Sequence, residues 1–183
     1  MNKLNIATLL CGLILFINSC GPSVTKTEDV TQQNPDDAKD YNNRGLVKND
    51  SQNYTGAIAD YNKAIQLKPD YADAYNNRGI AKNDLQDHIG AITDYNKAIQ
   101  LKPDYAFAYN NRATAKYALQ DYTGAIADCN KAIQLKPDYA NAYFNRGLSK
   151  VELQDFTGAC LDWSKAGELG YSEAYTFIQK YCK

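Results

Sequence analysis

The side chains that most often carry enzyme chemistry are scarce in this sequence. His88 is the only histidine, and no Cys, His and carboxylate residues stand together at the spacing of a metal site. No nucleophile has a histidine partner in a recognisable order, and no glycine-rich phosphate loop occurs. We therefore expect no enzyme, no metal and no cofactor, and we interpret His88 as a packing residue.

Polar residues suited to pairing recur instead at an interval of 34 residues. Four arginines are each followed, sixteen residues later, by an aspartate. The pairs are Arg44 and Asp60, Arg78 and Asp94, Arg112 and Asp128, and Arg146 and Asp162. We predict an ion pair within each repeat, because buried pairs of this kind set geometry. The alternative is that the arginines are cations for an acidic ligand.

A tandem unit must position these residues. The phrase YNKAIQLKPDYADAYNNRG begins at Tyr61 and returns with small changes from Tyr95 and from Cys129. A fixed period of this length indicates one supersecondary unit copied in tandem. In each unit, apolar and small residues recur twice at helical spacing around a polar break, which predicts two helices joined by a tight turn. The units are 38–71, 72–105, 106–139 and 140–171.

The predicted helix boundaries carry their own signals. Short side-chain acceptors that favour an N-cap precede each second helix, at Asn53, Asp87, Asp121 and Asp155. Prolines that end this helix follow at Pro69, Pro103 and Pro137. We expect the next residues to cap the following first helix: Asp70, Asp104 and Asp138.

Other places of the unit are also constant. The fourth place is aromatic, at Tyr41, Tyr75, Tyr109 and Tyr143. The eighth is small, at Gly45, Gly79, Ala113 and Gly147, and we expect it to face the small residue of the second helix, at Ala57, Ala91, Ala125 or Ala159. With an aromatic residue or His at the seventeenth place, Ala at the twentieth and twenty-seventh and Pro at the thirty-second, this pattern resembles the tetratricopeptide repeat. The resemblance implies an all-α fold, a right-handed α-solenoid of four helix-turn-helix repeats.

The fourth unit departs from the pattern, with Trp163 in place of Tyr and Tyr171 in place of Pro. After it, residues 172–183 place Ala174, Phe177, Ile178 and Tyr181 on one face of a short helix. A terminal repeat needs a cover with a polar outer face. We therefore predict that residues 172–183 form a C-terminal capping helix.

In tetratricopeptide arrays the first helices line a concave face, and the resemblance implies that a sixth-place Asn can bond a ligand's main chain. These residues are Asn43, Asn77, Asn111 and Asn145, and helical periodicity puts beside them Leu46, Ile80, Thr114, Leu148 and Phe107. An amide carries a donor and an acceptor, which suits a peptide unit. The alternative is that these asparagines are solvated residues that serve solubility. A clamp for a terminal carboxylate is not expected, because Lys39 is the only basic residue at a second place.

The N-terminal residues have a separate character. An apolar run from Ile6 to Ile17 would span only ~18 Å as a helix, against ~30 Å of hydrocarbon core, which predicts a signal peptide over residues 1–19. The residues INSC resemble a bacterial lipobox that ends in a lipidated Cys20. Residues 20–37 contain too little apolar surface to fold and are predicted to form a flexible tether. An ordinary secreted protein and an uncleaved anchor are the alternatives.

Three cysteines follow the N-terminal segment, Cys129, Cys160 and Cys182, and they allow one disulfide. Helix pairing brings together residues equidistant from a turn, and the midpoint of Cys160 and Cys182 lies beside Gly170. An oxidising compartment would allow these two to form a disulfide, leaving Cys129 as a buried thiol.

Taken together, the sequence predicts a non-enzymatic interaction module. We expect a lipoprotein anchored to a membrane of the bacterial cell envelope, whose groove binds a peptide segment or a partner protein. In the alternative, the array packs laterally in a membrane-associated complex and the groove is unused. The 20 basic and 21 acidic residues form no cluster that would suit a nucleic acid, so no nucleic-acid partner is expected.

Overall fold

The computed structural model describes residues 37–182, and within that range every regular element is an α-helix. The helices are α1 (Ala38–Asp50), α2 (Tyr54–Leu67), α3 (Ala72–Asp84), α4 (His88–Leu101), α5 (Ala106–Ala118), α6 (Tyr122–Leu135), α7 (Ala140–Glu152), α8 (Phe156–Glu168) and α9 (Ala174–Tyr181). The prediction of an all-α array of helix pairs is confirmed. The predicted signal peptide, Cys20 and the tether, apart from Asp37, lie outside the described residues.

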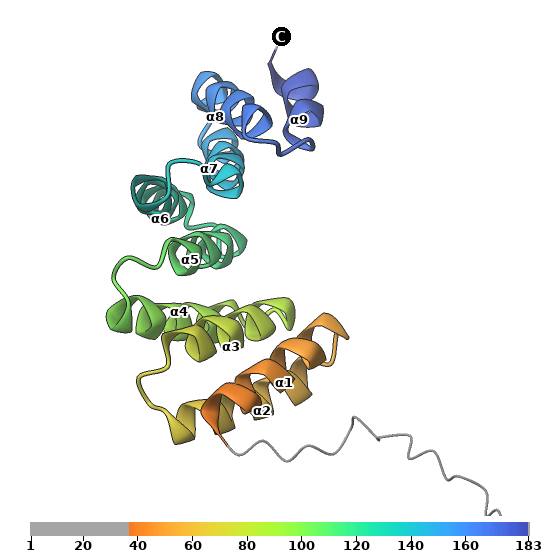
Figure 1. Cartoon of the computed structure of the whole chain (residues 1–183). Helices are drawn as coiled ribbons and strands as arrows, with labels where there is room; N and C mark the ends of the chain where they lie inside the picture. The colour runs from red at the N-terminus through yellow and green to blue at the C-terminus, as the bar shows by residue number, and fades with distance from the viewer. Residues whose placement is uncertain (1–36, 183) are drawn as a thin grey trace, which may run out of the picture. The chain divides into compact units, whose positions relative to one another are not determined.

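The helices stack in chain order (Figure 1). Each first helix packs against the second helix of its own pair, and each second helix against the first helix of the next pair. The first helices also contact one another along the array, as α1 with α3, α3 with α5 and α5 with α7. One hairpin cannot bury its apolar face alone, so stability comes from this stacking.

The predicted N-caps of the second helices are confirmed. Asp87 Oδ1 accepts a hydrogen bond from the backbone N–H of Gly90 at 2.9 Å, and Asn53, Asp121 and Asp155 do the same in their repeats. A Cβ atom on Gly90 would lie 2.1 Å from Asp87 Oδ2. Glycine three residues after the cap therefore leaves room for the cap side chain.

The predicted caps of the first helices are wrong for α3, α5 and α7. The N-cap residues are Tyr71, Tyr105 and Tyr139, and none of them makes a side-chain cap hydrogen bond. Backbone bonds close the turn instead, since the N–H of Tyr71 donates to Lys68 O and that of Ala72 to Asp70 O, both at 3.1 Å. This turn places each aspartate one residue too early. Only α1 has such a cap, where Asp37 Oδ1 accepts from the N–H groups of Lys39 and Asp40.

In three repeats the small eighth place is a glycine whose nearest neighbour is an aromatic ring of the second helix, and in the third repeat Ala113 packs with Ala125, the alanine predicted for it. A Cβ atom on Gly79 would lie 2.6 Å from the Tyr95 ring, and Gly45 and Gly147 face Tyr61 and Trp163 in the same way. In the third repeat, Ala113 lies in a buried cluster with Cys129, which occupies the place of the tyrosine. A larger residue on the first helix thus accompanies a smaller one on the second.

Helix α9 covers the last repeat. The helix begins at Ala174, two residues later than predicted. The ring centroid of its Phe177 lies 5.2 Å from that of Trp163 and 5.0 Å from that of Phe144. Ala174 and Ile178 belong to the same core. The stripe predicted from sequence therefore faces α7 and α8.

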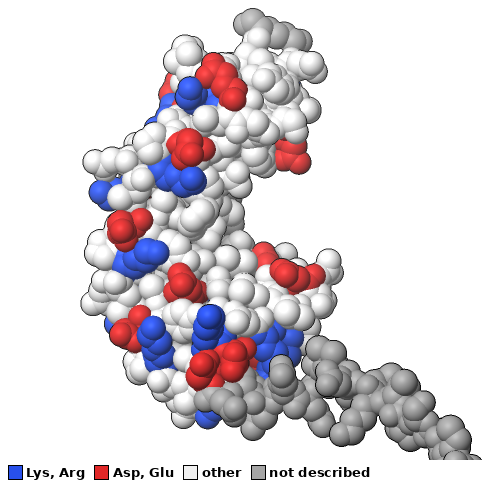
Figure 2. Space-filling model, viewed as in Figure 1, with Lys and Arg blue, Asp and Glu red and all other residues white. Residues whose placement is uncertain are grey.

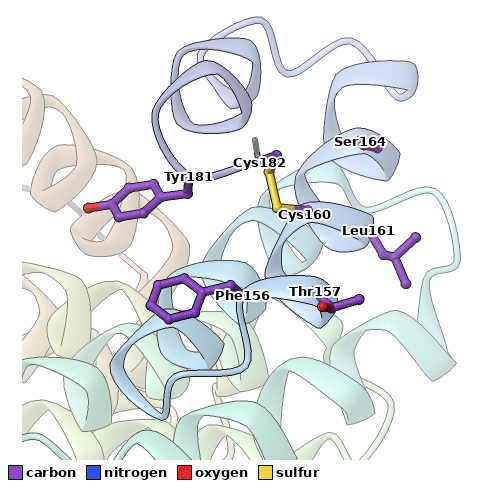
Figure 3. Close-up of a pocket in the computed structure, with 7 residues that line it drawn as sticks. All are labelled: Phe156, Thr157, Cys160, Leu161, Ser164, Tyr181 and Cys182. Atoms are coloured by element: carbon purple, nitrogen blue, oxygen red, sulfur yellow. A yellow bond between two sulfur atoms is a disulfide. The ribbon is translucent and has the colours of Figure 1, made fainter.

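A disulfide joins α8 to the residue that follows α9. Cys160 and Cys182 are bonded, with their Cα atoms 5.8 Å apart (Figure 3). The bridge lines a hollow of about 350 Å³ together with Phe156, Leu161 and Tyr181. Cys129 is a buried free thiol, and burial raises its pKa to about 12.

Removal of this disulfide is expected to loosen α9. The bonded cysteines are 22 residues apart, for which loop-closure entropy suggests about 3 kcal/mol of stabilisation. Reduction of the oxidised protein should lower the unfolding free energy by about that amount in a urea titration. The Cys160→Ala/Cys182→Ala variant is the control, because reductant should leave its stability unchanged. Recovery of the unlinked peptides from non-reduced, oxidised protein would contradict the bridge.

Candidate protein-binding groove

The first helices form one face of the array. α1, α3, α5 and α7 lie on the same side of the stack in Figure 1, and the space-filling view shows that side hollowed. Red atoms lie at the ends of this hollow and its centre is white (Figure 2). We call this face the groove, and define it by the second, sixth, ninth and thirteenth places of the four first helices.

A ladder of amides crosses the groove. The Nδ2 atom of each sixth-place Asn donates to Oδ1 of the fifth-place Asn in the preceding repeat, at 3.0 Å. The three bonds are Asn77 to Asn42, Asn111 to Asn76, and Asn145 to Asn110. The fifth-place residues are buried, whereas Asn77, Asn111 and Asn145 are half-buried. The sixth-place asparagines therefore connect neighbouring repeats, which neither sequence interpretation foresaw.

The two ends of the ladder differ from its middle. Asn43, which has no earlier repeat to bond, is exposed. At the other end Phe144 occupies the fifth place. Its ring centroid lies 4.6 Å from that of Tyr171 and 5.0 Å from that of Phe177. Asparagine occupies both the fifth and the sixth place in the first three repeats, and Phe144 replaces the fifth-place asparagine in the last. This pattern is the sequence signal that could have revealed the ladder.

The ladder leaves hydrogen-bonding capacity on the groove side. An amide has two N–H donors and a carbonyl acceptor. Among residues 37–182, no hydrogen bond reaches Oδ1 of Asn111 or Asn145, and Asn111 Nδ2 makes a single bond. These groups are held in fixed positions and remain able to bond a peptide main chain.

Apolar side chains flank the amides. Leu46 and Phe107 are 40% and 48% exposed, while Ile80 and Leu148 are half-buried and Thr114 is exposed. A small hollow of about 50 Å³ lies between α5 and α7, lined by Ala113, Thr114, Tyr117, Asn145, Leu148 and Ser149. The groove residues predicted from sequence thus lie together on the first helices.

The repeated arginines are paired with buried aspartates of the second helices. Arg78 donates from Nε to Asp94 Oδ2 at 2.9 Å and from a second nitrogen to Oδ1 at 2.5 Å. Lys82 adds a third contact to Asp94 at 2.8 Å, and Asp94 is only 2% exposed. The predicted Arg–Asp pairs are confirmed in all four repeats. We call each group of Arg, Asp and Lys a clamp.

Two partners of the clamp were missed in the sequence. The eleventh-place lysine pairs with the same aspartate in every repeat, at Lys48, Lys82, Lys116 and Lys150. Arg78 also donates to Asn62 of the preceding repeat at 2.6 Å, as Arg112 does to Asn96 and Arg146 to Asn130. The constant Lys four residues after each Arg was a visible signal for the first partner. The second depends on how repeats stack.

Metal and membrane features are absent from the described part. No group of three or more His, Cys, Asp or Glu residues in residues 37–182 could hold a metal ion. In the same range no helix combines the length and the apolar character of a membrane span.

His88 lies half-buried with Nδ1 2.8 Å from Asn83 Oδ1.

Comparisons with known proteins agree with this geometry. A family model described as TPR repeat matches residues 47–86 and 113–154, and one described as tetratricopeptide repeat matches residues 72–105. Together these matches cover more than half of the chain, which belongs to the tetratricopeptide repeat family. A comparison with curated protein sequences found no match.

Solved structures show the same fold. The first tetratricopeptide domain of Spaghetti (RPAP3), bound to the HSP90 peptide SRMEEVD, is 26% identical with a TM-score of 0.63, over 64% of this chain and 93% of that one. MamA is 25% identical with a TM-score of 0.69, over 78% and 83% of the two chains. The domain of Arabidopsis OM64 is 26% identical with a TM-score of 0.62, over 63% and 95%.

Acid should weaken the first clamp. Burial alone would raise the pKa of Asp60, but hydrogen bonds from Arg44 and Lys48 outweigh it and hold the pKa below its usual value. Because the pKa of Asp60 is lower in the folded than in the unfolded state, its charge stabilises the fold. This stabilisation is complete above the unfolded pKa of about 4 and is lost as pH falls through the folded pKa. Asp60→Asn should therefore cost about 3 kcal/mol near neutral pH, and the cost should fall steadily as pH drops below about 4.

Urea titrations of the wild type and of this variant at several pH values measure the difference. Asp70→Asn, in an exposed turn, is the matched control and should show little difference at any pH. A loss for Asp60→Asn that stays constant between neutral and acid pH would show that the clamp does not depend on the charge of Asp60.

Proposed function

We propose that the protein is a non-enzymatic interaction module whose groove binds an extended segment of a partner protein through its main chain. The observation that carries this proposal is the amide ladder, which holds Asn oxygen atoms and N–H groups at regular intervals between apolar side chains. Main-chain recognition needs a donor and an acceptor at each contact, and an amide supplies both.

The structural neighbours support this class of ligand. The Spaghetti (RPAP3) domain holds a peptide, and this chain is 26% identical to it. Basic groove residues that could grip a terminal carboxylate are restricted here to Lys39, among the groove places. We therefore propose an internal peptide segment as the ligand.

We also propose that the module is attached to a bacterial envelope membrane through lipid on Cys20. This part rests on the apolar run that ends at INSC. A single acyl chain gives only marginal binding, so stable attachment requires more than one.

A second candidate function is lateral packing in a membrane-associated complex with an unused groove. The observation that favours it is a row of leucines at the ends of the first helices, where Leu85, Leu119 and Leu153 are 45%, 44% and 49% exposed. Substitution of these leucines by serine separates the two functions. If the leucine-to-serine variant no longer bound the partner while groove variants bound it normally, lateral packing would be favoured.

The groove should lose its partner when the ladder is shortened. Asn77→Ala/Asn111→Ala removes two amides that could face a ligand, and we expect partner binding at least tenfold weaker, since each lost hydrogen bond costs about 1 kcal/mol. The same variant also removes two bonds between repeats, so its stability must be measured. The amount of partner retained by the mature domain, followed by titration with the identified partner, gives the affinity.

Asn96→Ala/Asn130→Ala is the matched control. It also removes two asparagines that bond a neighbouring repeat, but on the second helices, where they accept from Arg112 and Arg146. Its stability should fall by a similar amount while its affinity stays unchanged. Equal loss of affinity in both variants would trace the effect to the fold and would overturn groove binding.

Cys20→Ser should prevent lipid attachment. Mass spectrometry of the wild type should find a diacylglycerol linked to the cysteine at the new N-terminus, and the protein should leave the membrane with detergent but not with salt. Wild-type protein that is unlipidated and free in the soluble fraction would contradict the anchor.

A further inference from the structure

The charged residues of the groove are mostly acidic. Among its second, sixth, ninth and thirteenth places, the single base is Lys39. The acids are Asp50, Asp73, Asp84 and Glu152, and all of them are exposed. The clamps account for this imbalance, because they hold the arginine and lysine of every repeat against a buried aspartate.

The acids of the groove have no cationic partner in residues 37–182, where every ion pair involves other carboxylates. Glu152 accepts a hydrogen bond from Tyr117 at 3.1 Å, and burial together with the nearby Asp73 carboxylate raises the pKa of Tyr105. Asp84 is exposed as a whole residue, but the neighbouring atoms bury part of its carboxyl group and raise its pKa. A cation brought by a ligand would therefore meet carboxylates that the fold leaves unneutralised.

Three of the acids oppose helix stability. Asp50, Asp84 and Glu152 are the last residues of α1, α3 and α7. The carboxyl end of a helix carries partial negative charge, which disfavours an acidic side chain there. The same place is acidic in three of the four repeats, and among residues 37–182 none of these carboxylates forms an ion pair.

The repeat that contains Asp50 also has unsatisfied polar groups. The Tyr61 hydroxyl and Asn49 Oδ1 are buried and have no hydrogen-bond partner among the described residues, and Tyr61 itself is fully buried. Burial raises the pKa of Tyr61, with smaller contributions from the charges of Asp50 and Asp60. Both atoms are shielded from solvent, and the Tyr61 ring packs on Gly45, so they add no hydrogen-bonding capacity to the groove surface.

The other half of the groove has Glu152 as its single acid and contains the hollow between α5 and α7. The hollow adjoins Thr114, which stands where the first and fourth repeats have Leu46 and Leu148. Its volume of about 50 Å³ suits a small aliphatic side chain such as valine. A ligand that fits both halves therefore combines cationic and small aliphatic residues.

We propose that the groove selects a basic extended segment of a partner protein, with Lys or Arg facing the acids at the helix ends and a small aliphatic side chain in the hollow between α5 and α7. This inference rests on the proposed function and specifies its ligand. Charge complementarity between groove and ligand speeds encounter and rejects acidic segments.

The geometry also sets the spacing of the cations. Packed helices lie roughly 10 Å apart, and an extended chain advances about 3.3 Å per residue. One repeat therefore corresponds to about three ligand residues. A cation at every third residue would match the thirteenth-place acids of the first, second and fourth repeats, while Ala118 occupies this place in the third.

Synthetic probes test this chemistry directly. We would measure, by fluorescence anisotropy with the full mature chain, the binding of labelled twelve-residue peptides that repeat Lys-Ser-Val, Glu-Ser-Val or Ser-Ser-Val. The Lys-Ser-Val probe should bind at least tenfold more tightly than the Glu-Ser-Val probe at low salt. Its advantage should shrink as salt is added. Equal or tighter binding of the acidic probe, or no binding of any probe, would overturn the proposal.

Variants locate the effect. Asp50→Asn/Asp84→Asn should remove most of the advantage of the Lys-Ser-Val probe and leave the Ser-Ser-Val probe unchanged. Asp70→Asn/Asp138→Asn removes the same charge from exposed turns between repeats and should change neither. If both double variants weaken the basic probe equally, the net charge of the protein is responsible and the groove is not the site.

The hollow has its own variant. Thr114→Leu introduces the residue that two other repeats already carry, so the fold should tolerate it, and it should weaken the Lys-Ser-Val probe at least threefold by filling the hollow. A Lys-Ser-Gly probe should bind both proteins equally. An unchanged Lys-Ser-Val affinity would remove the hollow from the proposal.

A photo-crosslinker distinguishes this inference from the proposed function. Placed at Leu46 or at Thr114, and as a control at the exposed Ala59 or Ala127 of the second helices, it reports whether any partner occupies the groove. Capture from the groove of a segment without cations would overturn the present inference and leave groove binding intact. Equal capture from the second helices would overturn groove binding itself.

Discussion

The buried aspartate of each second helix is the constraint on which the array depends. Asp94 is 2% exposed and meets both Arg78 and Lys82, so three charges from two helices converge at one point. Breaking such a buried pair costs several kcal/mol, because the remaining charge stays uncompensated. The clamp therefore fixes the separation and rotation of the two helices in a repeat, and through Asn62 it reaches the preceding repeat as well.

The amide ladder also ties neighbouring repeats together, through side chains of the first helices. Clamps connect repeats through second-helix asparagines, and the ladder connects them through first-helix asparagines. Each repeat is thus held to its neighbour at two places. The clamps also remove the repeat's cations from the groove, which leaves amides, apolar side chains and a few acids to meet a ligand. The character of the groove is in this sense a consequence of how the fold neutralises its buried carboxylates.

Much of the fold could be predicted from the sequence because its signals are local. Caps such as Asp87 and the sixteen-residue spacing of Arg78 and Asp94 depend only on one hairpin, and both predictions are confirmed. The ladder could not be predicted in this way, since the bond from Asn111 to Asn76 depends on the rotation between repeats. The role of Tyr71 as an N-cap residue depends on backbone bonds in the turn, which residue type alone does not determine. The predicted groove residues lie on the first helices, and their binding of a peptide stays a prediction; the inter-repeat bonds of Asn77, Asn111 and Asn145 were not foreseen.

A double-mutant cycle on Arg112 and Asp128 tests the central claim most directly. The unfolding free energy of the wild type, of Arg112→Ala, of Asp128→Ala and of the double variant would be measured by urea titration of the oxidised protein. If the clamp fixes the hairpin, the coupling energy should be at least about 2 kcal/mol, at the upper end of the range for contacting residues. A coupling below about 0.5 kcal/mol, as for an exposed ion pair, would contradict the account.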